Sequence, residues 1–151
     1  MTFRTLEQKR ALYAWNVVST LKNTFDSGKL LTLFRKLPSM IMQNGLITTI
    51  AFLKSKSISE KKLKEEGAVL YGLENYMLYR LNHSGEIPTS FEGLQRKDTE
   101  KLDGTHSTYL KKLLNMEFSV YRLESSEAIY IAQWLKRIAE GEIEDEGQGS
   151  D

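Results

Sequence analysis

The stretch LPSMIMQNGLITTIAFL, residues 37–53, is the longest uncharged segment of this 151-residue chain. Its apolar residues, among them Ile41, Ile47 and Phe52, point all round a helical axis, so a helix here must be covered on several sides. Pro38 suits the first turn, where its missing N–H costs nothing. The stretch is too short and too rich in amides and threonines for a membrane span. We therefore predict one buried helix over residues 37–53, the hub of a helical bundle, and no membrane partner.

Gly45 lies in the middle of this predicted helix. A helical Gly costs about 1 kcal/mol relative to Ala, so we expect a neighbouring element to approach closely at this position. The amides of Gln43 and Asn44 lie beside it. Hydrogen bonding within the core is the first interpretation of these amides, and recognition of a partner is the alternative.

On the N-terminal side, residues 3–25 carry an apolar stripe at helical spacing that includes Leu6, Val17 and Leu21. Residues 26–28 end this helix in the prediction, because Gly28 can adopt the positive φ of a helix end. A short helix is expected over residues 29–36.

On the C-terminal side, Ser57 and Glu60 have the spacing of a capping box, which predicts a helix running from there to Asn82. Residues 89–105 are polar and predict a loop with at most one helical turn. Two further helices are expected, from near His106 and from near Ser125. Since no segment alternates with period two for long, the fold class is all-α, a single-domain bundle of five or six helices. The predicted domain covers residues 1–140, and residues 141–151 form an acidic, disordered tail.

The composition holds 21 Lys+Arg, 20 Asp+Glu and no Cys. Absence of Cys excludes a disulfide scaffold, a thiol nucleophile and an iron–sulfur site, and it fits a reducing cytoplasm. The N-terminus lacks the apolar run of a signal peptide, so we expect a cytoplasmic protein. Six of the acids lie in residues 140–151, which hold no Lys or Arg, so residues 1–139 have a net charge of 21 − 14 = +7. The near-neutral total hides a basic body.

No catalytic motif stands out: the chain has no phosphate-binding loop, no nucleophile elbow and no H-E-x-x-H zinc motif. His83 and His106 lie in polar contexts at predicted helix boundaries, which favours surface or capping histidines. A small helical nuclease that uses either histidine is the alternative. The acidic tail lacks the layout of a calcium-binding loop. We expect no cofactor, no metal and no enzyme activity.

One arginine and one group of lysines are informative. Arg10 lies within the apolar stripe of the first helix, and a buried guanidinium needs a carboxylate, helix carbonyls or an external anion. Pairing inside the protein is the first interpretation, and a ligand phosphate is the alternative. Five lysines are concentrated in a short span and could contact a phosphate backbone without base specificity: Lys54, Lys56, Lys61, Lys62 and Lys64. An ordinary solvated helix face is the alternative.

Two stretches resemble a known family. Residues 37–53 resemble the "P-x-M-I-x-x-N-G-L-x-x-T-x-A-F-L" helix of the small subunit of type III-B CRISPR (Cmr) effector complexes. Residues 121–142, YRLESSEAIYIAQWLKRIAEGE, are similar to its closing helix, with the E-A and W-L-K-R-x-A pattern, and Arg10-Ala11 and Val17 also fit. The resemblance implies a small, helical, non-catalytic subunit that stacks into an inner filament beside backbone subunits, which hold the guide RNA and cut the target RNA.

The resemblance also implies a positive face toward the guide–target duplex. The five lysines become the first candidates for RNA contact, and Arg10, Lys136 and Arg137 the second. The expected partners are CRISPR RNA, target RNA, the backbone and large subunits of the complex, and copies of the chain itself. A helical protein–protein adaptor without RNA contact remains the alternative.

Overall fold

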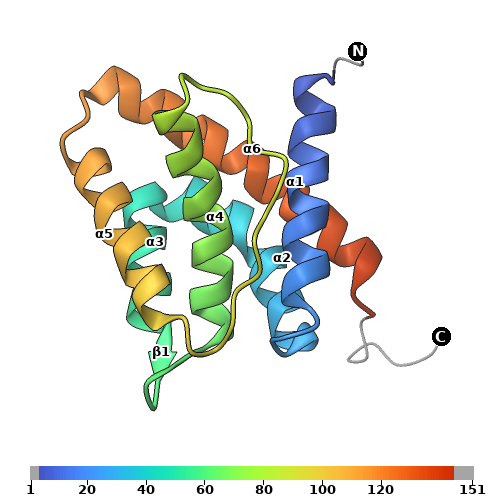
Figure 1. The fold of residues 1–151 in the computed structure, drawn as a ribbon. Coiled ribbons are helices and arrows are strands. Elements are labelled where there is room, and N and C mark those ends of the chain that lie inside the picture. The colour runs from blue at the N-terminus through green and yellow to red at the C-terminus, as the bar shows by residue number, and fades with distance from the viewer. Residues whose placement is uncertain (1–3, 145–151) are drawn as a thin grey trace.

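The computed structural model describes residues 4–144, which form six helices and one short β-hairpin (Figure 1). The elements in chain order are α1 (Leu6–Leu21), α2 (Ser27–Asn44), α3 (Leu46–Ser55), β1 (Ile58–Ser59), β2 (Lys62–Leu63), α4 (Glu65–Asn82), α5 (Thr99–Leu114) and α6 (Phe118–Glu142). The prediction of an all-α bundle of five or six helices is confirmed. No helix within residues 4–144 is long and apolar enough to cross a membrane.

The helix predicted over residues 37–53 is wrong in its bounds. The chain stays helical through Pro38, which is buried inside α2, and changes direction at Gly45 instead. Gly45 has φ 91° and ψ 159°, a conformation that side chains with a Cβ avoid. Nothing lies within 4 Å of the position that a Cβ would occupy. Backbone conformation, and not the close approach of a neighbour, therefore accounts for this glycine.

Two smaller predictions near these helices are also wrong. Gln43 and Asn44 are exposed, so they do not hydrogen bond within the core. Gly28 lies inside α2 without a positive φ. The boundary there is made by Asp26, whose carboxylate Oδ2 accepts from the Lys29 N–H at 2.9 Å and caps α2. The first helix accordingly ends at Leu21, four residues before the expected end.

The centre of the bundle is the antiparallel pair of α2 and α6, with α1 packed on α6 and α4 on α2. α6 buries a stripe of small and aliphatic residues: Ala128, Ile131, Ala132, Leu135 and Ala139. It begins seven residues before the expected start near Ser125. At the other end it runs through Glu142, and Ile143 is buried, so ordered structure extends past residue 140. Residues 145–151 of the predicted tail lie outside the described part.

The capping box predicted at Ser57 and Glu60 is absent. Glu60 and Lys61 have φ values of 51° and 64°, as a two-residue hairpin turn requires, and they join β1 to β2. The Ser57 hydroxyl donates to the Leu53 carbonyl at 2.7 Å instead of capping a helix. α4 begins only at Glu65, and it ends at Asn82, as predicted.

The loop predicted over residues 89–105 is shorter than expected, because α5 begins at Thr99. The residues between α4 and α5 run alongside α1 (Figure 1). His106 therefore lies within a helix and not at a helix boundary.

Candidate nucleic-acid interface

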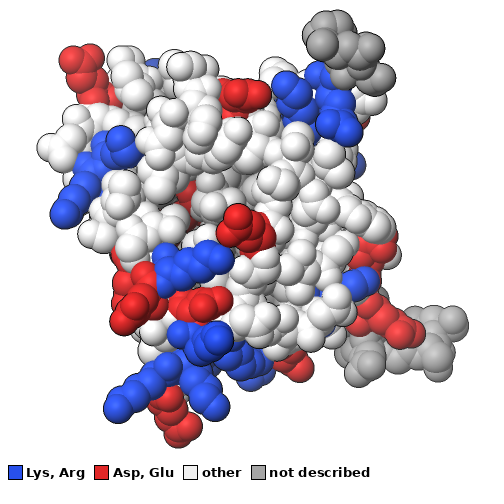
Figure 2. Space-filling view, in the orientation of Figure 1, with Lys and Arg blue, Asp and Glu red and all other residues white. Residues whose placement is uncertain are grey.

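The structure gathers the five candidate lysines at one end of the molecule. We call Lys54, Lys56, Lys61, Lys62 and Lys64 the hairpin lysines, because they lie in the last turn of α3, at the residue that follows it, in the hairpin, or at the residue before α4. Figure 2 shows blue side chains gathered at the end that carries the hairpin. The positive-φ turn produces this arrangement, since it folds β2 back along β1.

The hairpin lysines differ in how free their ammonium groups are. Lys54 Nζ lies 2.9 Å from Asp103 Oδ1 of α5 and is half-buried. Lys56 Nζ lies 5.5 Å from the centre of the Phe52 ring. Lys61 and Lys62 are exposed, and within residues 4–144 neither makes an ion pair. Lys61 and Lys62 are therefore the most available cations for a phosphate.

Arg96 and Lys97, which the sequence pattern did not single out, belong to a basic segment at the same end of the molecule. The Leu63 N–H donates to the Arg96 carbonyl at 2.8 Å, and Arg96 Nη1 donates to the Leu63 carbonyl at 3.0 Å. Arg96 also pairs with the buried Glu65 at 2.7 Å, which gives it a structural role. Lys97 follows and is exposed. The adjacent Arg96 and Lys97 are visible in the sequence, but the pairing of Arg96 with β2 depends on the fold.

Arg10 pairs inside the protein, as the first interpretation predicts. Its Nη2 and Nε donate to the two carboxylate oxygens of Glu127 at 2.7 and 2.9 Å. The Tyr76 hydroxyl donates to Glu127 Oε2 at 2.5 Å. Burial opposes ionisation of Glu127, but the hydrogen bonds from Arg10 and Tyr76 outweigh it and lower the pKa of this carboxyl. The guanidinium is thus satisfied without a ligand.

Lys136 and Arg137 do not join the hairpin lysines. They lie near the C-terminal end of α6, which packs against α1 away from the hairpin (Figure 1). Arg137 is exposed beside Glu7 and Trp134, which line a small cavity with it. The structure therefore does not bring the eight candidates together: five lie at the hairpin end, and Arg10, Lys136 and Arg137 lie on α1 and α6.

The two histidines have unrelated surroundings. His83 follows α4, is exposed, and stacks on Tyr79 with ring centres 3.8 Å apart, as expected for a surface or capping histidine. The same expectation is wrong for His106, whose Nδ1 lies 2.9 Å from Glu74 Oε2 in the α4–α5 interface. The side chains of His106 and Glu74 are 11% and 0% exposed. Burial raises the pKa of Glu74, and the hydrogen bond from His106 opposes this.

This histidine–carboxylate pair is enclosed by packed helices, so a polymer substrate has no access to it. The described residues contain no group of three His, Asp or Glu that could hold a metal ion. For the nuclease alternative, His106 and Glu74 are therefore not an accessible acid–base pair.

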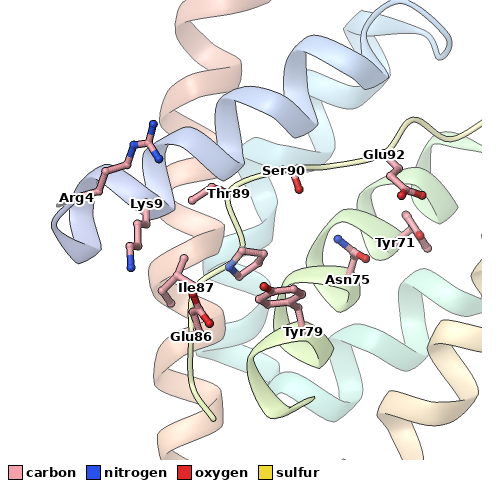
Figure 3. Close-up of a pocket in the computed structure, with 11 residues that line it drawn as sticks. Arg4, Lys9, Tyr71, Asn75, Tyr79, Glu86, Ile87, Thr89, Ser90 and Glu92 are labelled. Carbon is pink, nitrogen blue, oxygen red and sulfur yellow. The ribbon is translucent and has the colours of Figure 1, made fainter. Parts of the chain in front are cut away.

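A polar cavity of about 510 Å³ lies between the start of α1, one face of α4 and residues 86–92 (Figure 3). Arg4 and Lys9 lie at one end of it, and Glu86 and Glu92 also line it. No hairpin lysine contributes to the lining. Since charges of both signs face the cavity, it does not favour a polyanion, and the hairpin end remains the candidate nucleic-acid interface.

A family model described as CRISPR-associated protein (Cas_Cmr5) matches residues 6–142, which cover all six helices of the described structure. The match spans most of the chain, including the hairpin. The chain therefore belongs to the Cas_Cmr5 family, the small subunit of type III-B Cmr complexes.

Proposed function

We propose that this chain is a cytoplasmic, non-catalytic scaffolding subunit of the Cmr complex that contacts the guide–target RNA through the hairpin lysines and stacks on copies of itself beside the backbone and large subunits. Family membership supports its place in a Cmr complex. The observation that carries the RNA contact is the gathering of Lys56, Lys61 and Lys62 as exposed cations at one end of the molecule.

The proposed contact is electrostatic. Lysine ammonium groups neutralise phosphates as point charges and release condensed counterions, which gives affinity without reading the base sequence. Lys61 and Lys62 can bind a phosphate without giving up an ion-pair partner, whereas Lys54 has to exchange Asp103 for a phosphate. Glu60 at the hairpin tip weakens the local positive potential. We therefore expect modest, sequence-independent affinity.

An RNA-binding titration tests this contact. Replacing Lys56, Lys61 and Lys62 by Gln should weaken binding of a single-stranded RNA by at least about tenfold at low salt, because three phosphate contacts are lost. The control is the Lys111→Gln, Lys112→Gln variant, which removes two exposed lysines at the C-terminal end of α5. Equal affinity of both variants and the unmodified chain would exclude the hairpin as the contact.

A second surface supports stacking. Three large apolar side chains are exposed where α5 meets α6: Leu114 at 62%, Phe118 at 75% and Leu123 at 74%. We call them the apolar corner. These three side chains lie within ten residues of the chain, and exposed apolar patches mark protein contacts in soluble proteins. The same corner favours the adaptor alternative, in which the chain binds only proteins.

Light scattering separates the two functions. A pure adaptor associates with its partners equally well with and without RNA, whereas an RNA-contacting subunit assembles further when RNA is added. Phe118→Asp with Leu123→Asp should reduce self-association in both cases. RNA-independent assembly together with absent RNA binding would favour the adaptor.

A further inference from the structure

A groove runs along α2 on the side where α3 and the start of α4 meet it. It consists of two adjoining cavities of about 540 and 490 Å³, which share Leu33, Lys36 and Glu66 in their linings. The cavities follow α2 from Gly28 to Asn44, which is about 24 Å at 1.5 Å per residue. This length corresponds to about four turns of a helix laid against it.

Two helical stripes form the walls of the groove near Gly45. Lys36, Met40 and Asn44 follow each other at intervals of four along α2. Thr48 and Phe52 have the same spacing on α3, and Lys56 is the residue that follows this helix. Each set therefore lies on one face of its helix. Phe52 is 44% exposed although it is a large aromatic side chain. Leu33, Met40 and Phe52 together give the groove a mainly apolar lining that no element within residues 4–144 covers.

The rim of the groove is positive. Four lysines line it: Lys29, Lys36, Lys56 and Lys64. Two carboxylates, Asp26 and Glu66, also line it, and that of Asp26 already caps α2 through the Lys29 N–H. The apolar lining and the lysine rim thus form one surface with two chemistries.

We infer that this groove binds an acidic amphipathic helix of a partner protein. Apolar side chains at positions i, i+4 and i+7 of such a helix would enter between Met40 and Phe52, and flanking carboxylates would meet the lysines of the rim. A nucleic-acid strand fits less well, because phosphates gain nothing from an apolar lining. Phe52 is moreover the one aromatic ring in the groove, and Lys56 already lies over it. The inference does not depend on RNA contact at the hairpin.

A designed peptide provides the probe. It has about 14 residues, or about 21 Å of helix, with Leu at i, i+4, i+7 and i+11 and Glu at the flanking positions. A second peptide carries Lys in place of every Glu. Fluorescence anisotropy with the full chain should show saturable binding of the acidic peptide and at least about tenfold weaker binding of the basic one.

Variants of the groove locate the site. Met40→Glu should weaken binding of the acidic peptide by at least about tenfold, because it places a carboxylate among the apolar contacts. Lys29→Gln with Lys36→Gln should weaken it by about three- to tenfold. Lys111→Gln with Lys112→Gln removes the same number of charges elsewhere and should leave binding unchanged. Circular dichroism verifies that each variant is folded.

Three outcomes would overturn the inference: no binding of the acidic peptide, equal binding of both peptides, or no effect of Met40→Glu. The groove would be assigned to RNA instead if a single-stranded RNA displaced the peptide and if Met40→Glu weakened the binding of that RNA. The Lys61→Gln, Lys62→Gln variant keeps the two proposals apart. This variant should lose affinity for RNA and keep its affinity for the acidic peptide. Failure of one proposal is therefore distinguishable from failure of the other.

Discussion

Cations in the interior of the bundle and cations at the hairpin have opposite surroundings. Arg10 and Arg80 pair with Glu127 and Glu124, which lie three residues apart on α6 and are further held by tyrosine hydroxyls. Lys61 and Lys62 are exposed and make no ion pair within residues 4–144. The interior charges thus hold α1 and α4 against α6, while Lys61 and Lys62 form no ion pair that would hold the fold together. Surroundings, and not position along the chain, separate structural cations from candidates for binding.

The largest expected effect comes from breaking an interior pair. Glu127→Ala removes the acceptor for both Arg10 and Tyr76 and leaves them largely buried. We expect the free energy of unfolding to fall by about 3 kcal/mol. Urea denaturation measures this, and RNA affinity of the folded variant should stay unchanged. A loss below about 1 kcal/mol would mean that the pair contributes little to stability.

Acid should weaken the same interior site. The pKa of Glu127 is lowered in the folded state, so its ionised form stabilises the fold above the unfolded-state pKa of 4.5. That contribution is lost as the pH falls below 4.5 and through the lower folded-state pKa. Glu74 acts in the opposite sense, because its pKa is raised by burial. Its contribution is present below 4.5 and is lost as the pH rises through its folded-state pKa.

Urea denaturation between about pH 3 and pH 7 separates these two carboxyls. Glu127→Gln should flatten the fall in stability on the acid side, whereas Glu74→Gln should steepen it. The opposite pattern would contradict the assigned directions of the pKa shifts.

At the hairpin we expect little effect on stability and a clear effect on RNA affinity, the reverse of the expectation for Glu127. Lys61→Gln with Lys62→Gln should change the free energy of unfolding by less than about 0.5 kcal/mol, because exposed side chains without partners are replaced. RNA affinity should fall several-fold at low salt. A marked loss of stability would show that the hairpin lysines have structural partners after all.

The smallest expected effect concerns Lys54, which belongs partly to both groups. Asp103→Asn removes its partner at 2.9 Å and frees the ammonium group. Surface pairs contribute about 0.2–1 kcal/mol, so RNA affinity should rise by about two- to threefold and stability should barely change. An unchanged affinity would place Lys54 outside the contact.

Local patterns predicted the helix class well and the helix boundaries poorly. The end of α4 at Asn82 follows directly from the polar residues and Gly85 that come after it. At Pro38 the expected break is absent, because the helix on both sides of it is held by packing against α6, and tertiary packing outweighs the cost of one proline. Gly45 makes the break through its positive φ, which composition alone does not distinguish from a glycine at a close contact.

The candidate site was predictable only in part. Five lysines within eleven residues stand out in any sequence, and their gathering at one end follows from the hairpin turn at Glu60 and Lys61. The partner of Arg10 is 117 residues away along the chain, so only the fold identifies it. The same holds for Glu74 and His106, which come from different helices. Long-range pairing is the information that local spacing lacks.

The salt dependence of RNA binding tests the central claim most directly. For single-stranded RNA the slope of log affinity against log salt is about −0.7 per phosphate contacted. Replacing Lys56, Lys61 and Lys62 by Gln should therefore make the slope shallower by about 2, while the Lys111→Gln, Lys112→Gln control keeps the slope of the unmodified chain. Identical slopes for all three proteins would contradict an electrostatic RNA contact at the hairpin.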